Sequence, residues 1–505
     1  MTEHSGVRSH AEAQLDRPAL EPGESPVFNE RGVIAEHYRD LQGLPVLDAA
    51  RCAYPLAKAS AASTVRAVLQ AVEIAILNLS DVMRRALADV EEGSIERASV
   101  KVCWARGFHR VLLRLSMMPQ QLGLVRAPVE AASRLDISES PAFEEYVGVL
   151  AQFDRALLDR IDTGSLDVEG LLADASLDNP LFVLLHLSRV SNHESTIWEL
   201  NLADVPVAAI VPSYQQFVVT AGMRDAVYDR VLKGDTYFTQ FRGLHQIPET
   251  LGEEANDHIE QAIRNIRDGH VAAAAAHLRC ASVLMEGMLA SLPPMADNLA
   301  TSDYHRIREN LGLTSGSHSV CLRFHMFTDL YQQLAEAIEA RVMSANAGAG
   351  PASLDEAVRS VDDARLQDAH SWLLHQLINE GLVIRNAILQ WREQHLHLPR
   401  NNLGGGYTKS LTGSPDAVLA VKKMRKGARQ ADAMLPLARA RGLATAGSDE
   451  MPRRLRAYLE SDGSLDARLL QCTGEITQRR FVAVQERLGF FANKCPFAAP
   501  PHRRA

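Results

Sequence analysis

Apolar residues with helical spacing lead up to a histidine in the C-terminal part of the chain. They recur at intervals of three, four or seven residues, which places them on one face of a helix expected at about 361–396. These residues are Leu373, Leu377, Ile384, Ile388, Trp391 and His395. A histidine that ends a buried apolar face can hold an apolar group that carries a metal, such as haem. Alone, such a histidine is more often an ordinary core residue, so the interpretation depends on the other motifs.

Three further segments place aromatic and charged side chains at fixed spacings. They are Phe241-x-x-x-His245-Gln246-x-x-Glu249, Tyr304-x-x-x-Arg308 with Leu311, Ser315 and Gly316 after it, and Tyr214-x-x-Phe217. An arginine can bind a carboxylate through two parallel hydrogen bonds, and a histidine can accept or transfer a proton. Aromatic and apolar side chains can enclose a flat ring. Each residue could also serve in ordinary packing or in a surface ion pair.

Together with Trp391-Arg392-x-x-His395, these motifs resemble the tryptophan 2,3-dioxygenase family over about residues 205–440, in both spacing and order. The resemblance implies an all-α fold, a multi-helix haem-binding bundle, to which this chain adds an N-terminal helical domain. It also implies one b-type haem per chain, with His395 as the axial ligand of the iron. Trp391, Ser315 and Gly316 would then adjoin the haem, where a glycine lets the backbone approach closely.

The same resemblance assigns roles around the substrate. Arg308 would hold a substrate carboxylate, and His245 would face the substrate from the distal side of the haem, so these two are the expected catalytic residues. The expected substrate-binding residues are Tyr214, Phe217, Phe241, Tyr304, Arg308 and Leu311, with Thr408 or Thr412 at the amino-acid group. We therefore expect a haem-dependent oxidoreductase, a dioxygenase that cleaves the 2,3-bond of L-tryptophan or a derivative to an N-formylkynurenine type product.

Two departures from the family pattern leave other functions open. After His395 the family has a Gly-Thr-Gly-Gly-Ser-Ser-Gly loop, whose threonine touches the substrate, whereas residues 404–413 read GGGYTKSLTG. Pro248 lies inside the distal histidine motif, where it would disturb a helix interior. One alternative is a haem-dependent aromatic hydroxylase or monooxygenase of secondary metabolism, acting on tyrosine or an indole. A second alternative is a haem-binding protein without catalysis.

Composition and charge exclude several classes of protein. The 505-residue chain has a net charge of −9 and no long basic run, so we expect no nucleic-acid partner. No uninterrupted apolar run reaches the roughly 18 residues of a membrane span, so we expect no membrane partner. The six cysteines are scattered without a Cys-x-x-Cys pair, which indicates a reduced, cytoplasmic protein without a zinc site. The expected partners are an aromatic small-molecule substrate, dioxygen and, by the resemblance, further copies in a homodimer or homotetramer.

The pattern along the chain predicts four regions. Residues 1–30 form a disordered tail, 31–200 an N-terminal helical domain, 201–442 the haem-binding dioxygenase-like domain, and 443–505 a small helical tail. The segment 205–214, VPVAAIVPSY, is the one strand-like or extended stretch, and its two prolines argue against a central strand.

An internal repeat is indicated by two segments of similar layout. Residues 71–119 and 246–293 each contain a helix, a turn with acidic residues or glycine, a second helix and a proline stop. The first copy has no distal histidine motif, since residues 69–73 read LQAVE, and it has no Trp-Arg-x-x-His. We therefore expect it to bind no haem and to pack on residues 205–440. In the family's oligomers, a neighbour's N-terminal segment occupies a comparable place and helps close the active site.

Overall fold

The computed structural model describes residues 38–124, 132–166, 169, 179–228, 237–311, 329–345, 353–403, 416–430 and 432–446. Within these ranges nearly all regular structure is helical, so the predicted all-α class is confirmed. The helices are α3 (Leu44–Cys52), α4 (Ala61–Glu91), α5 (Ile95–Leu124), η2 (Ile137–Glu139), α6 (Pro141–Asp162), α8 (Pro180–Leu202), α9 (Tyr214–Val218), α10 (Thr220–Tyr228), α11 (Phe238–Arg267), α12 (Val271–Ala290), α13 (Leu292–Asn298), α14 (Thr301–Leu311), α15 (Asp329–Ala345), α16 (Leu354–Ala364), α17 (Ala369–Asn402), α18 (Ala417–Gln430) and α19 (Leu435–Ala446).

The extended stretch expected at 205–214 contributes one strand of a small ribbon. Strand β2 (Val205–Val207) pairs antiparallel with β1 (Ser133–Leu135), and Arg134 lies opposite Pro206. Both strands of a two-stranded ribbon are edge strands. A proline has no backbone N–H, and an edge strand tolerates it where that N–H would point away from the partner strand. The proline therefore fits this position, as its exclusion from a central strand predicts.

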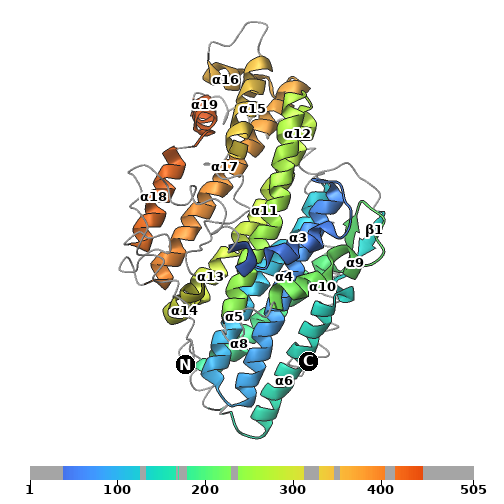
Figure 1. The fold of residues 1–505 in the computed structure, drawn as a ribbon, viewed down its shortest axis with the longest axis vertical. Coiled ribbons are helices and arrows are strands. Elements are labelled where there is room, and N and C mark those ends of the chain that lie inside the picture. The colour runs from blue at the N-terminus through green and yellow to red at the C-terminus, as the bar shows by residue number, and fades with distance from the viewer. Residues whose placement is uncertain are drawn as a thin grey trace, which may run out of the picture. The chain divides into compact units, whose positions relative to one another are not determined.

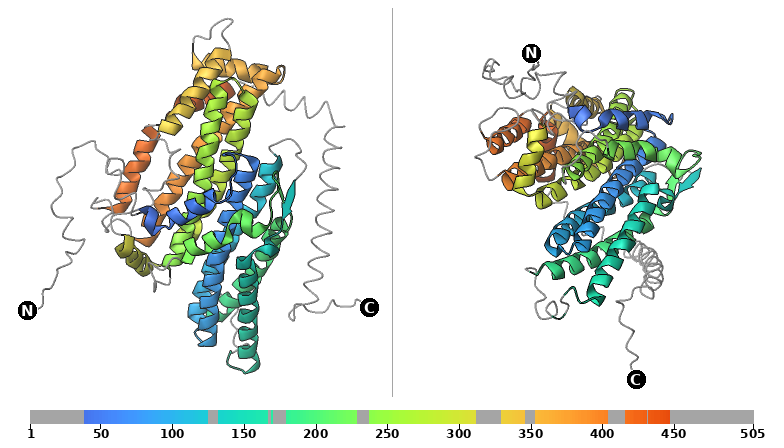
Figure 2. Two further views of the ribbon diagram at one scale, coloured as in Figure 1. Left: turned by 45° about the vertical axis from the view of Figure 1, so that its right-hand side comes forward. Right: turned by 60° about the horizontal axis from the view of Figure 1, so that its bottom comes forward.

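The helices up to Ala440 belong to one compact unit, within which they form two packed groups that meet along α4 and α11. In the first group α4 packs on α5 and α6, and α5 packs on α8. In the second group α11 packs on α12 and α15, and α12 packs on α17. Figures 1 and 2 show the blue N-terminal helices against the green and orange helices that follow. The expected packing of the N-terminal helices on residues 205–440 is thus present, while the domain boundary near residue 200 stays a prediction.

Helix α4 joins the two groups because it is buried on every side. Among the described helices it is the one long and apolar enough to cross a membrane, and its apolar stretch lies wholly inside the protein. Several of its buried polar side chains have polar partners on other helices. For example, Thr64 Oγ1 lies 2.8 Å from His258 Nε2, and Asp81 Oδ2 accepts from Gln240 Nε2 at 2.7 Å. Helix α4 is therefore a core helix with polar links to α11.

The crossing of α4 and α11 is close because a glycine lies at it. A Cβ atom added to Gly243 would lie 2.5 Å from Cγ and 2.6 Å from Oδ1 of the buried Asn78 side chain. Five residues later Pro248 is also buried, and α11 nevertheless continues from Phe238 to Arg267. The expectation that Pro248 disturbs this helix is therefore wrong. Packing of α11 against α4 and α12 outweighs the one backbone hydrogen bond that a proline removes.

The long helix expected at 361–396 is two helices, α16 and α17, with a turn at residues 365–368 between them. The break occurs because Asp368 caps the new helix: its Oδ2 accepts from the backbone N–H of Ser371 at 2.7 Å. From there α17 runs past the expected end to Asn402. Its apolar face is buried as predicted, with Leu377, Ile384 and Ile388 at 0–1% exposure.

Candidate functional site

Three helices, α11, α14 and α17, bring the sequence motifs of the second group together. The Phe241 ring on α11 and the Tyr304 ring on α14 have centroids 6.2 Å apart. Helix α14 also packs on α17, and Asn402 at the end of α17 donates to the carbonyl of Leu299, just before α14. The distal motif, the Tyr-x-x-x-Arg motif and the Trp-Arg-x-x-His motif therefore face a common interior region.

His245 lies on α11 in a defined tautomer. Its Nδ1 is 2.8 Å from the carbonyl oxygen of Phe241, one turn earlier, and a carbonyl can only accept. Nδ1 therefore carries the proton, and Nε2 keeps a lone pair. The imidazole packs on the Phe241 ring at 4.3 Å, and burial lowers the pKa of His245 to about 4. The residue as a whole keeps partial exposure, and its ring is a neutral hydrogen-bond acceptor through Nε2.

His395 lies on α17 and presents a second neutral imidazole. Its Nδ1 is sealed from solvent and has no hydrogen-bond partner among the described residues, although the residue as a whole is partly exposed. Burial lowers the pKa of His395 to about 3, and nearby Arg392 and His245 lower it further. His245 thus lies within electrostatic range of His395, so the two imidazoles, on α11 and α17, belong to the same buried region.

A phenol and a guanidinium lie one turn apart on α14, and the phenol ring of Tyr304 lies near Phe241, which packs on His245. Tyr304 and Arg308 are four residues apart and so share one face of the helix. Burial raises the pKa of Tyr304 and lowers the pKa of Arg308, and each residue partly offsets the shift of the other. By contrast, Arg306 is 64% exposed and pairs with Asp303. Arg308 is thus the arginine of α14 that is partly buried, and it lies on the same face of the helix as Tyr304.

Two of the expected substrate-binding residues, Tyr214 and Phe217, lie elsewhere. They belong to α9, where the Tyr214 hydroxyl donates to Glu73 Oε2 at 3.3 Å and the Phe217 ring packs edge-on against Tyr54 at 6.2 Å. Glu73 is five residues from Asn78, the residue of α4 that meets α11. At 100° per residue the two point about 140° apart. Helix α4 therefore stands between Tyr214 and His245.

Of the other expected site residues, two lie on α14 and α17, and four lie outside the described residues. Leu311 is buried at the end of α14, and Trp391 is half-buried on α17, one turn before His395. The remaining four, for the haem edge and the substrate's amino-acid group, lie outside the described residues: Ser315, Gly316, Thr408 and Thr412.

Sequence reasoning missed a set of contacts that hold the His245 turn of α11. The side-chain amide of Gln246 donates to the carbonyl oxygens of Gln42 at 2.8 Å and Ala226 at 2.9 Å. One turn further along, Glu249 accepts from the hydroxyl of Tyr38 at 2.8 Å. Both Tyr38 and Gln42 come from the start of the described chain, which the resemblance does not cover.

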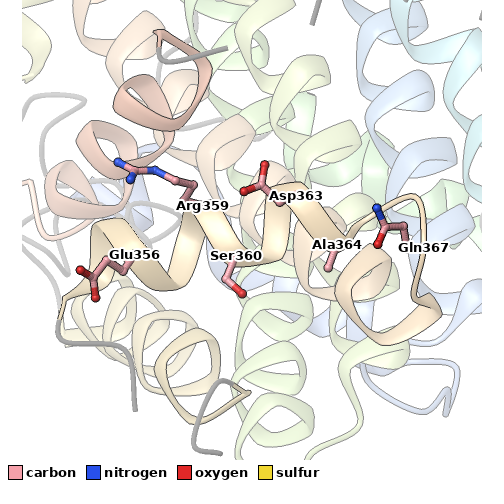
Figure 3. Close-up of a pocket in the computed structure, with 6 residues that line it drawn as sticks. All are labelled: Glu356, Arg359, Ser360, Asp363, Ala364 and Gln367. Atoms are coloured by element: carbon pink, nitrogen blue, oxygen red, sulfur yellow. The ribbon is translucent and has the colours of Figure 1, made fainter. Parts of the chain in front are cut away.

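A shallow hollow lies on the surface of α16 (Figure 3). All of its lining residues come from this helix and the turn after it: Glu356, Arg359, Ser360, Asp363, Ala364 and Gln367. They follow helical spacing along one face, so the hollow is a groove between surface side chains. No second element supplies a lining residue there, and we assign it no function.

Comparison of the chain with known protein families finds no matching family model, and comparison with curated proteins finds no relative.

Proposed function

We propose that this protein binds one b-type haem through His395 and uses it to oxidise an indole, or another aromatic amino acid, with dioxygen. The supporting observation is a pair of neutral, partly exposed imidazoles, His245 and His395, carried by different helices and facing one interior region. Phe241 packs on His245 and lies near Tyr304, and Arg308, whose guanidinium is partly buried, lies one turn after Tyr304 on α14.

The residues present fit a haem in two respects. An iron ligand must be a neutral imidazole, and burial keeps His395 neutral. In addition, Nδ1 of His395 is a buried nitrogen without a hydrogen-bond partner among the described residues, and a buried polar atom of this kind is one that a bound group can complete. The apolar face of α17 would supply a wall against the flat macrocycle. Bound haem would supply the reduced iron that reaction with dioxygen requires.

The remaining side chains would bind and orient the substrate. Arg308 would hold a carboxylate through two parallel hydrogen bonds, strengthened because the guanidinium is partly removed from water. Phe241 and Tyr304 would enclose the flat ring. Nε2 of His245 carries a lone pair because Nδ1 donates to Phe241. It can therefore accept a hydrogen bond from an indole N–H, or take that proton as the ring is oxidised.

The iron ligand is tested by replacing His395. His395→Ala should give a folded protein that lacks a Soret band of wild-type intensity after haem is added. His397→Ala is the matched control, since this exposed histidine lies two residues further along the same helix. It should keep the full band, as should His245→Ala. Full haem retention by His395→Ala, with unchanged ligand-field bands, would refute the assignment.

The carboxylate clamp is tested on the ferrous protein with L-tryptophan and with an indole that has no carboxylate. Arg308→Ala should lower kcat/KM for L-tryptophan roughly 10²-fold, which corresponds to about 3 kcal/mol for a charged hydrogen-bonded pair. It should have little effect on the simple indole. The exposed Arg306→Ala is the control and should leave both rates near wild type. Equal losses for both substrates would contradict the clamp, and oxidation of phenols but not of indoles would favour the hydroxylase.

A further inference from the structure

The first part of each helical group follows the same plan at a constant separation of 176 residues. Helices α3 and α10 each have nine residues, and they begin at positions 44 and 220 and end at 52 and 228. The residue before each helix is left-handed, Gly43 with φ 66° and Val219 with φ 60°. Valine rarely adopts this conformation, so its presence at the position equivalent to Gly43 points to a shared backbone plan.

The two long hairpins of helices obey the same separation. Helices α4 and α11 end at positions 91 and 267, and α5 and α12 begin at 95 and 271. Between them lie Gly93 with φ 80° and Gly269 with φ 83°. The backbone bonds of the two turns also correspond: the N–H of Ser94 donates to Asp89 and that of His270 to Asn265, each at 2.7 Å. The repeat thus extends without insertion from about residue 38 to 95 and from 214 to 271.

Side-chain contacts repeat as well, but across the two copies. Gln246 of the second copy donates to the carbonyl of Gln42 in the first, and Gln70 of the first copy donates to the carbonyl of Val218 in the second at 3.1 Å. Residues 42 and 218 differ by 176, as do 70 and 246. Exchanging the two copies therefore turns each of these contacts into the other.

The carboxylates show the same reciprocity. Tyr38 donates to Glu249, and Tyr214 donates to Glu73, so each copy's tyrosine binds the other copy's glutamate. The positions again differ by 176 in both pairs. A two-fold relation between the copies accounts for both sets of contacts, since such a relation makes every contact between unlike positions occur twice.

We propose that this chain contains a duplicated unit whose copies exchange their first segments, and that the exchanged segment Tyr38–Gln42 positions the His245 turn of α11. The role of His245 as a site residue rests on the proposed function. Gln246 and Glu249 lie one and four residues after His245, and each forms a hydrogen bond with the exchanged segment. Tyr38-x-x-Leu41, and not Tyr214-x-x-Phe217, is therefore the copy of the tyrosine motif that reaches the site.

The first copy has no equivalent site to position. Leu69 stands at the position of His245, 176 residues earlier. Between α5, α6 and α8 the space is filled by a fully buried aromatic cluster, in which Trp198 Nε1 donates to His109 Nδ1 at 3.1 Å and both rings pack on Tyr146. One exchanged segment thus serves a functional site, and the other serves packing on α4.

The duplication supplies a matched pair of variants for the test. Tyr38→Phe and Tyr214→Phe each remove one hydroxyl that donates to a buried glutamate at equivalent positions, so both should lower the melting temperature to a comparable extent. The imidazole signals of His245 are recorded by NMR in haem-free protein with labelled histidine, and they are assigned from their loss in His245→Gln. Tyr38→Phe should shift these signals, and Tyr214→Phe should leave them in place.

A second measurement uses haem-loaded protein and an indole as the probe. Tyr38→Phe should weaken indole binding about tenfold, because the turn of α11 that carries His245 loses one hydrogen bond of ordinary strength, and Tyr214→Phe should change it less than about twofold. Glu249→Gln keeps an acceptor for Tyr38 and should preserve the His245 signals, even if Tyr38→Phe fails to fold. Unmoved His245 signals in Tyr38→Phe, or equal shifts in both tyrosine variants, would overturn the inference. Because the NMR arm uses haem-free protein, it separates this result from a failure to bind haem.

Discussion

The close crossing of α4 and α11 makes Gly243→Ala a sharp test of how the site-bearing helix is seated. In an exposed helix this substitution stabilises by about 1 kcal/mol, because alanine loses less backbone freedom on folding. At position 243, however, the new methyl group would lie within 2.6 Å of Cγ and Oδ1 of Asn78, a separation that real side chains do not tolerate. Asn78 is fully buried, so its amide cannot turn into solvent.

The expected cost can be worked from these contacts. Overpacking of a core costs about 1–3 kcal/mol, and displacing Asn78 also breaks its 2.8 Å bond to the carbonyl of Ile74, worth about 1 kcal/mol net. After subtraction of the gain in helix propensity, Gly243→Ala should lower the free energy of unfolding by about 1–3 kcal/mol. Urea denaturation followed by circular dichroism measures this quantity.

Two further variants give the measurement its control. Gly148 lies in α6 with no atom within 4 Å of an added Cβ, so Gly148→Ala should be neutral or stabilising by up to about 1 kcal/mol. In Asn78→Ala/Gly243→Ala the clash is gone, and the double variant should be at least about 1 kcal/mol more stable than the sum of the single changes predicts. A wild-type stability for Gly243→Ala, or strict additivity in the double variant, would refute the reasoning.

Two other predictions concern the helices around the site. Burial raises the pKa of Glu73 from 4.5 to about 7 despite hydrogen bonds from Ser140 and Tyr214, so the folded protein holds a proton there that the unfolded chain releases. The contribution of Glu73 to the free energy of unfolding should therefore fall by up to roughly 3 kcal/mol between pH 4.5 and 7, and Glu73→Gln should reduce the protein's decline over this range by that amount, while the exposed Glu144→Gln should not. A chain that begins near residue 200 should be insoluble or unable to bind haem, because α11 loses its packing on α4 and the hydrogen bond from Tyr38. Size-exclusion chromatography and haem titration measure these two properties. A monodisperse fragment that binds haem would contradict the prediction.

The sequence predicts the helices well where an apolar face is long. The face that includes Leu377, Ile384 and Ile388 is buried as its spacing indicates, because burial of such a stripe is what stabilises a helix in a protein. The boundary at Asp368 was missed because a capping aspartate outweighs a continuing apolar pattern. Pro248 was misjudged for the opposite reason, since tertiary packing outweighs the local cost of a proline.

The site was predictable only in part, because local motifs do not reveal an exchange of segments. The motif spacing predicts that His245, Tyr304, Arg308 and His395 share one region. The structure places Tyr304 near Phe241, which packs on His245, and the roles of the four residues stay predictions. The resemblance covers Tyr214 but not Tyr38, so it assigns Tyr214 to this region, whereas in the structure Tyr38 bonds to Glu249, one turn after His245. A comparison of the chain with itself at a separation of 176 residues would have aligned the two tyrosines. Even then, which tyrosine reaches His245 depends on packing between the copies.

The reciprocal tyrosine bonds also set an order of events during synthesis of the chain. Tyr38 finds its acceptor only when Glu249 has been made, 211 residues later, and Gln70 finds Val218 only after 148 residues. Until then the apolar surface of α4 has no α11 to cover it, although the first helices have already left the ribosome. Contacts so distant in sequence slow folding and leave intermediates exposed to aggregation. The nascent first half should therefore depend on chaperones until α11 emerges, and both halves should then acquire their protease resistance together.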